Sequence, residues 1–124
     1  MKRLIAAAIL LVFVASVYFT GYIYTDKACK KTTKLLEECV TAYDSNENPE
    51  NKAEDLKKYW ARAEKTLSIF ANHARIDEIE KSIDTLLIYS NTDEKEIFKE
   101  YSGEVKTLLH QLMEDTVPSV HSVF

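Results

Sequence analysis

The sequence has little of what tight turns, β-sheets and reactive sites require: it contains 2 glycines, 2 prolines and 2 cysteines in 124 residues. Glycine-rich phosphate loops and multi-turn β folds are disfavoured, because both need residues that accept a positive φ or break strands. The enzyme motifs GxSxG, HExxH and GxGxxG and the Walker loop are also absent. A single helical domain remains as the expected fold.

The distribution of charge argues against nucleic acid as a partner. Residues 26–124 contain all 20 acidic residues but only 14 of the 16 basic ones, which gives this part a net charge of −6. A nucleic-acid-binding surface needs clustered Lys and Arg to displace counterions from phosphates. We therefore expect no nucleic-acid partner, and an anionic substrate is disfavoured for the same reason.

Charged residues are missing from residues 4–24, LIAAAILLVFVASVYFTGYIY, which follow Lys2 and Arg3. As a helix this run extends about 32 Å, at 1.5 Å per residue, which matches a bilayer core of about 30 Å. Aromatic rings gather near its C-terminal end, where they prefer the headgroup level. We predict a single transmembrane signal anchor over residues 1–25.

A cleaved secretory signal is the main alternative to an anchor. Such a signal has a shorter apolar core and small residues at its cleavage site. Val14-Ala15-Ser16 is a poor site of this kind, and the apolar run continues for eight residues beyond it. A lipoprotein is disfavoured because Cys29 follows Asp26-Lys27-Ala28 rather than a lipobox.

Two signals compete over orientation. Lys27, Lys30, Lys31 and Lys34 closely follow the span, and the positive-inside rule would keep them in the cytoplasm. A short basic start followed at once by an apolar run is instead the usual signal-anchor arrangement, which exports the bulk of the chain. We expect a single-pass protein of the cytoplasmic membrane with most of the chain outside the cytoplasm.

Apolar residues recur every three or four positions after the span, which is the spacing of amphipathic helices. The first stripe, over 28–43, follows the span without Gly or Pro, so one continuous helix is expected. Three more stripes run over about 51–70, 76–89 and 93–112, with turn formers between them. None of these helices would be stable alone in water, so their apolar faces must meet.

The predicted fold is therefore all-α: an N-terminal transmembrane helix that continues into an antiparallel bundle of about four helices over residues 26–116. Asn51 with Glu54 and Asp93 with Glu96 resemble N-terminal capping pairs. The acidic residues at 77, 78 and 80 are placed in the first turn of the third helix, where the helix dipole favours negative charge. Residues 117–124 form an apolar tail, which suggests a docking segment.

Few residues are candidates for chemistry. Cys29 and Cys39 are ten positions apart on one helix, about 15 Å along its axis, which is too far for a disulfide within the chain. They are expected in the core, with a bond between two chains as the alternative. No Cys/His spacing suits zinc. His73 and Asp77 lie four residues apart and form one edge of a possible metal or general-base site.

The simpler interpretation of His73 is a histidine at a helix terminus, next to exposed carbonyls. His110 is expected to be exposed near Glu114. Trp60, the only tryptophan, lies on an apolar stripe and is expected in the core, with a place in a partner groove as the alternative. Trp60, His73, Asp77 and the tail residues Val120 and Phe124 are therefore the candidate interaction residues, and no catalytic, cofactor or metal site is expected.

The basic start, single span, mid-chain Trp60 and the run Ile76-Asp77-Glu78-Ile79-Glu80-Lys81-Ser82-Ile83 after His73 resemble a family of small membrane-anchored proteins of Gram-positive anaerobes, domain of unknown function 4363. The resemblance covers nearly the whole chain and implies a cell-envelope location and a helical exported part. It carries no established activity. The tail, which ends His121-Ser122-Val123-Phe124, departs from the Asn-Ile-aliphatic ending of that family.

Together these observations predict a non-enzymatic interaction or scaffold protein of the envelope, which binds another envelope protein or a second copy of itself. The alternative is a sensor or chaperone-like bundle that holds a small ligand or peptide between its helices. An enzyme is the least favoured reading, because no reactive group of residues accompanies the stripes.

Overall fold

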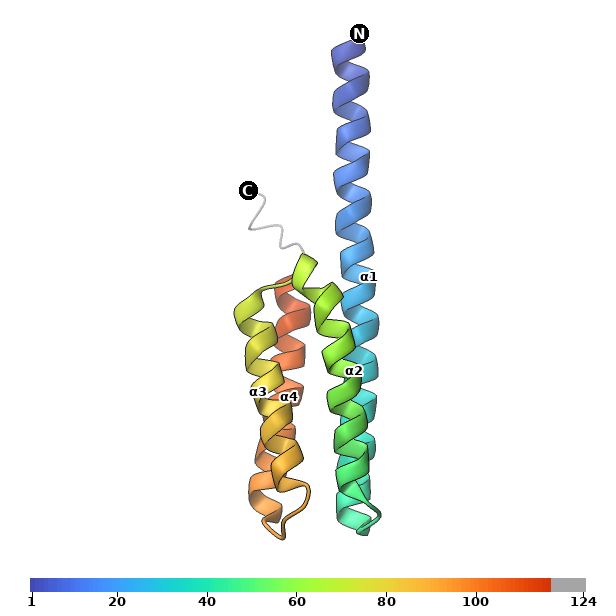
Figure 1. Ribbon diagram of the computed structural model, residues 1–124. Helices are drawn as coiled ribbons and strands as arrows, with labels where there is room; N and C mark the ends of the chain where they lie inside the picture. The colour runs from blue at the N-terminus through green and yellow to red at the C-terminus, as the bar shows by residue number, and fades with distance from the viewer. Residues whose placement is uncertain (117–124) are drawn as a thin grey trace.

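The computed structural model describes residues 1–116 and contains four α-helices and no strand within them (Figure 1). Helix α1 spans Lys2–Ser45, α2 Pro49–Phe70, α3 His73–Tyr89 and α4 Lys95–Thr116. The predicted all-α class is confirmed, and so is the continuous first helix. The predicted apolar tail, residues 117–124, lies outside the described residues.

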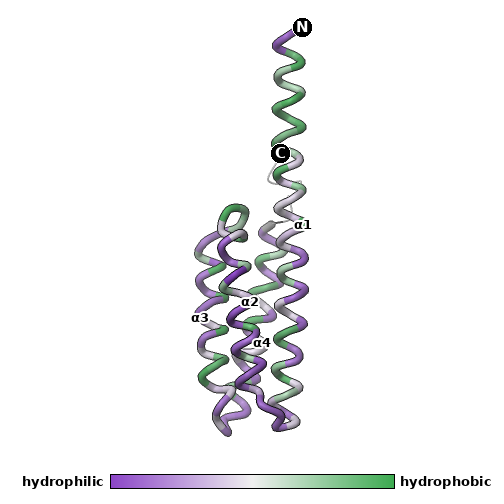
Figure 2. The backbone as a smooth tube through the Cα atoms, turned by 45° about the vertical axis from the view of Figure 1, so that its right-hand side comes forward, coloured by the Kyte–Doolittle hydropathy of each residue, from purple (hydrophilic) through white to green (hydrophobic). Residues whose placement is uncertain are grey.

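Helix α1 has two parts with different surroundings. Its 44 residues extend about 66 Å at 1.5 Å per residue. Residues 1–20 are exposed throughout, whereas burial begins at Gly21 and recurs at intervals to Ala42. In the described part of the chain α1 is the one helix long and apolar enough to cross a membrane. We call residues 2–20 the apolar half of α1, and Figure 2 shows it extending alone beyond the bundle.

The four helices form an antiparallel bundle in which each helix packs mainly against two others. Helix α1 packs against α2 and α4, and α3 packs against the same two helices from the other side. The α1–α2 and α3–α4 connections lie together at one end of the bundle (Figure 1). The α2–α3 connection lies at the opposite end, from which the apolar half of α1 projects. We call these the far end and the α1-exit end.

The core consists of the apolar stripes that the sequence shows. Its fully buried side chains come from all four helices, and they include Leu36, Trp60, Ile79, Phe98 and Leu112. Because each stripe covers one side of its helix, the charged residues between the stripes remain at the surface. The amphipathic pattern therefore predicts correctly which face of each helix is buried.

The N-cap predicted for α2 at Asn51 is wrong by three residues, because the observed N-cap is Asn48. The helix begins at Pro49, whose fixed φ suits the first helical position, and Asn48 precedes it with a φ of 54°. Asn51 therefore lies inside the first turn, where it is exposed and does not cap. The end of α1 is set by Asn46, whose φ of 57° is left-handed and whose N–H bonds back to the last turn of α1.

The predicted starts of α3 and α4 also need correction. Asn72 Oδ1 accepts a 2.8 Å hydrogen bond from the Ala74 N–H, so α3 begins at His73 and Asp77 lies beyond its first turn. Helix α4 begins at Lys95, and the Thr92 hydroxyl rather than the Asp93 carboxylate accepts a hydrogen bond there, from the Glu94 N–H at 3.4 Å. The sequence around each helix start contains several residues that could cap the helix. Which of them does so depends on where the packed helix begins.

Candidate interaction surfaces

The histidine and acid proposed as one edge of a site do not form one. His73 and Asp77 are both exposed at the start of α3 and make no hydrogen bond or ion pair with each other in the described structure. His73 lies at a helix terminus, as its simpler interpretation predicts, but this is the start of α3, where N–H groups rather than carbonyls of that helix are exposed. No group of three His, Cys, Asp or Glu in residues 1–116 is arranged to hold a metal ion.

Trp60 lies in the core and is 1% exposed. Its indole Nε1–H is buried and has no hydrogen-bond partner. The structure therefore gives Trp60 the packing position that its stripe predicts, and leaves none of its ring on the surface of the folded bundle. The tail candidates Val120 and Phe124 lie outside the described residues.

The two cysteines are also core residues, as their positions on the first stripe predict. Both thiols are free and buried. Cys29 Sγ lies 3.8 Å from the carbonyl oxygen of Leu109, and Cys39 Sγ lies 3.6 Å from that of Pro49. Burial, together with the nearby Asp26 carboxylate, raises the pKa of the Cys29 thiol to about 12. Burial alone raises the pKa of the Cys39 thiol to about 11. Burial and a raised pKa both disfavour the thiolate, which is the reactive form, so we expect both thiols to be unreactive at neutral pH.

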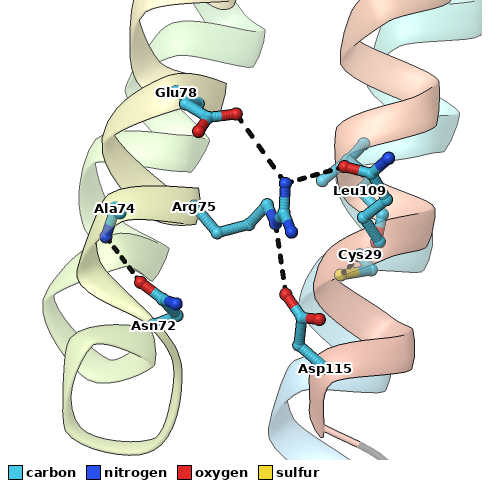
Figure 3. A network of polar contacts seen from close by, with 8 residues as sticks. Cys29, Asn72, Ala74, Arg75, Glu78, Leu109 and Asp115 are labelled. Atoms are coloured by element: carbon cyan, nitrogen blue, oxygen red, sulfur yellow. Dashed lines mark hydrogen bonds and ion pairs between the residues drawn. The ribbon is translucent and has the colours of Figure 1, made fainter.

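An arginine at the α1-exit end ties α3 to α4 (Figure 3). Arg75 Nε donates to the Asp115 carboxylate at 3.1 Å, and Arg75 Nη1 donates to the Gln111 side-chain oxygen at 2.7 Å. The same Nη1 lies 3.8 Å from the Glu78 carboxylate. Sequence reasoning missed this group, because its members lie some forty residues apart and meet only once the register of α3 on α4 is fixed.

A groove of about 470 Å³ runs between α1 and α4. Its apolar residues are the buried Cys29 and Leu109 and the half-buried Met113. Charged residues from both helices also line it, together with His110: Asp26, Lys30, Lys34, Glu37 and Lys106. Several are paired, with Lys30 3.1 Å from Asp26, Lys106 3.6 Å from Glu37 and His110 3.0 Å from Glu114. The exposure of His110 beside Glu114 is as predicted.

Carboxylates gather where α2 faces α3. Desolvation, followed by the charge and hydrogen bond of Glu80 and the charges of Asp77 and Asp84, raises the pKa of Glu64. Lys57 Nζ lies 3.0 Å from Asp84 Oδ1 and offsets part of this negative charge. This face can take up a proton more readily than an isolated glutamate.

The α1-exit end carries an aromatic contact between α1 and α2. A Cβ built on Gly21 would lie 2.5 Å from Phe70 Cδ1 and 2.8 Å from Phe70 Cγ, so the phenyl ring occupies the space that any other residue at 21 would need. The neighbouring Ile69 is 74% exposed. The end of α2 thus brings an aromatic ring onto the helix that leaves the bundle and an aliphatic side chain to the surface beside it.

These features define a class of protein: a four-helix bundle whose first helix continues into a long apolar segment, with no group of three metal-ligating side chains in residues 1–116. The chain belongs to the family described as domain of unknown function (DUF4363), which it matches over residues 19–123. The family predicted by resemblance is therefore confirmed. Comparison with curated proteins and with solved structures gives no match.

Proposed function

We propose that the chain is a single-span membrane protein whose bundle lies outside the cytoplasm and serves as a non-enzymatic protein-interaction module of the cell envelope. One observation carries the membrane part. Among residues 1–116, all exposed large hydrophobic side chains except Ile69 and Ile88 fall within residues 1–23. The same helix supplies core residues to the bundle from position 21 onward. Its apolar half therefore needs a cover that the bundle does not supply, and a bilayer is the cover its length fits.

Because α1 is one continuous helix, it supports a function that depends on where the bundle is held relative to the membrane. No turn separates the apolar half from the packed half, so the bundle is held at a fixed height above the membrane. The partner is another envelope protein or a second copy of the chain. The non-enzymatic part of the proposal is supported by the thiols and histidines of residues 1–116: Cys29 and Cys39 are buried, and His73 and His110 are exposed on different helices.

Topology is the first property to test, and the buried native thiols make cysteine labelling clean. Glu100 is exposed on α4, so Glu100→Cys presents a thiol on the bundle surface. Intact cells that express this variant are treated with a membrane-impermeant maleimide, and the wild-type chain is the blank. Export predicts that the variant reacts in intact cells. Reaction only after lysis would place the bundle in the cytoplasm and overturn the envelope role.

Assembly is tested with a membrane-impermeant amine cross-linker on the same cells. The interaction role predicts one recurrent cross-linked species of fixed mass, either a dimer or a complex with one other protein. Deletion of residues 117–124 reports whether the apolar tail contributes, because loss of the species in that variant assigns docking to the tail. A chain that stays monomeric under all conditions contradicts the interaction role.

The groove between α1 and α4 supports a second candidate function, which is binding of a small amphipathic ligand or peptide. Its volume of about 470 Å³ lies within the range of small-molecule pockets, and Leu109 and Met113 supply apolar contact. Native mass spectrometry of the detergent-extracted chain would show a co-purifying molecule. Met113→Trp should displace that molecule by filling the groove, whereas a species retained in the variant is bound elsewhere.

A further inference from the structure

The α2–α3 connection is the part of the bundle that reaches farthest along the exposed half of α1. It lies at the α1-exit end in Figure 1, and Figure 2 shows it as a hydrophobic turn beside the base of the apolar segment. Residues 69–71, Ile-Phe-Ala, are the last two residues of α2 and the residue that follows it, and Asn72 then caps α3. We call residues 69–71 the turn. A connection between two surface helices would ordinarily be polar, because it faces water.

The contact between Phe70 and Gly21 fixes the height of this turn along α1. Gly21 is three residues before Tyr24, the last residue of the apolar run over 4–24, and five before Asp26, the first charged residue after it. At 1.5 Å per residue, the phenyl ring therefore lies about 4.5 Å inside the apolar run and about 7.5 Å from the level of the first charge. A bilayer that covers residues 4–24 must meet the turn.

The exposed side chain at the turn matches this location. Ile69 is 74% exposed. Among residues 24–116 the one other large hydrophobic residue that is exposed is Ile88, at 66%. Ile88 lies one residue before the end of α3, at the far end of the bundle. The two isoleucines are thus alike in chemistry and exposure, and they lie at opposite ends of the molecule.

We propose that the turn formed by residues 69–71 inserts into the interfacial layer of the same membrane that α1 crosses. The partner of this surface is the lipid bilayer itself. The inference rests on the proposed membrane anchoring, and adds to it a second point of contact. A single helix would let the bundle lean toward any side, whereas two contacts set its tilt and decide which helix faces point away from the membrane.

A fluorescent probe of lipid depth tests the insertion. The full chain carries a nitrobenzoxadiazole label on Ile69→Cys, Ile88→Cys or Leu10→Cys, one site at a time, in vesicles of phosphatidylcholine and phosphatidylglycerol. Leu10 and both isoleucines are exposed, so the substitutions leave the core intact, and the buried Cys29 and Cys39 remain unlabelled. Lipids with a nitroxide near the headgroup or deep in the acyl chain then serve as quenchers.

Insertion predicts that the label at position 69 loses most of its emission to the shallow nitroxide, while the label at 88 keeps its emission with both. The label at position 10 reports on the anchor, and is expected to be quenched by the deep nitroxide. Quenching at 10 without quenching at 69 would overturn the insertion and leave the proposed anchor standing.

Failure of the anchor gives a different result. An unquenched label at position 10 would contradict both the proposed membrane anchoring by α1 and the insertion of the turn. A label at 69 that is blue-shifted but unquenched by either nitroxide would show that protein, such as a second copy of the chain, covers the turn. That result would also overturn the insertion. Equal quenching at 69 and 88 would mean that the label itself binds the bilayer at either position. That result would overturn the proposal, because insertion requires a difference between the two ends of the bundle.

Discussion

The phenol of Tyr43 donates a 2.9 Å hydrogen bond to the carbonyl oxygen of Thr92, which lies forty-nine residues away in the α3–α4 connection. The same ring stacks on Phe98, with centroids 4.0 Å apart and an angle of 11° between the planes. Tyr43 belongs to the last turn of α1. Its two contacts therefore join α1 to the α3–α4 hairpin at the far end of the bundle. The Arg75 group closes the α3–α4 seam at the other end.

Replacing Tyr43 separates the two contacts. Tyr43→Phe keeps the ring and removes the hydroxyl, and should lower the free energy of unfolding by about 1 kcal/mol, the usual net value of one hydrogen bond. Tyr43→Ala also loses the stacking on Phe98 and should cost about 3 kcal/mol or more. Urea unfolding of the full chain in detergent micelles measures both. Equal losses in the two variants would mean that the hydrogen bond carries the whole effect.

The two glycines of the chain make a matched pair, because both lie within helices and differ in their surroundings. Gly21→Ala forces the Phe70 ring to move, and should destabilise the chain by about 1–3 kcal/mol, as overpacking does. A Cβ on Gly103 meets nothing within 4 Å, so Gly103→Ala should stabilise α4 by about 0.5–1 kcal/mol through backbone entropy.

The same urea titration measures the glycine variants, and a double variant identifies the cause. Because Phe70→Ala removes the ring that obstructs position 21, Gly21→Ala should cost much less in that background, which gives a clear coupling between the two sites. Additive effects would show that Gly21 is required for another reason.

The raised pKa of Glu64 predicts a dependence of stability on pH. A carboxyl whose pKa is higher in the folded than in the unfolded chain binds more protons when folded, so its contribution to stability falls as pH rises above the ordinary glutamate value. Glu64→Gln removes this term. The variant should therefore be more stable than the wild type at pH 7, with the difference vanishing toward pH 4.

The measurement is the urea midpoint of wild type and variant across that pH range, with Glu104→Gln as the control. Glu104 is an exposed carboxylate on α4, so its replacement removes the same charge from the surface and should leave the pH profile unchanged. A wild-type stability that rises between pH 4 and 7 relative to Glu64→Gln would contradict the direction of the shift.

The hydrophobic pattern predicts the bundle because it is a local consequence of what each helix must bury. Leu36, Leu56, Ile79 and Leu112 each lie on a predicted stripe, and each is fully buried. Caps are less predictable, because Asn51 satisfies the local rule as well as its neighbours do, and Pro49 determines the start instead. Local motifs offer alternatives, and tertiary packing selects one.

The features that depend on register could not be predicted from the sequence. Arg75 pairs with Asp115, and Phe70 covers Gly21, only because the four helices are aligned at particular heights. A shift of one turn would leave every stripe buried and break both contacts. The candidate residues His73 and Asp77 were selected by spacing within one helix, which says nothing about what other helices bring near them.

Trp60 is buried in the core as its stripe predicts, and variants can separate this role from the partner groove that the sequence left as the alternative. Trp60→Ala should lower stability by about 3–5 kcal/mol, because a large buried ring is replaced by a cavity. Trp60→Phe should cost far less, because the smaller ring still fills much of the space and removes a buried N–H that has no hydrogen-bond partner. If Trp60 instead formed part of a partner groove, Trp60→Phe would weaken assembly with little change in the urea midpoint. Cross-linking and unfolding measured on the same variants decide between these roles, with His110→Ala, an exposed side chain on α4, as the control that should change neither.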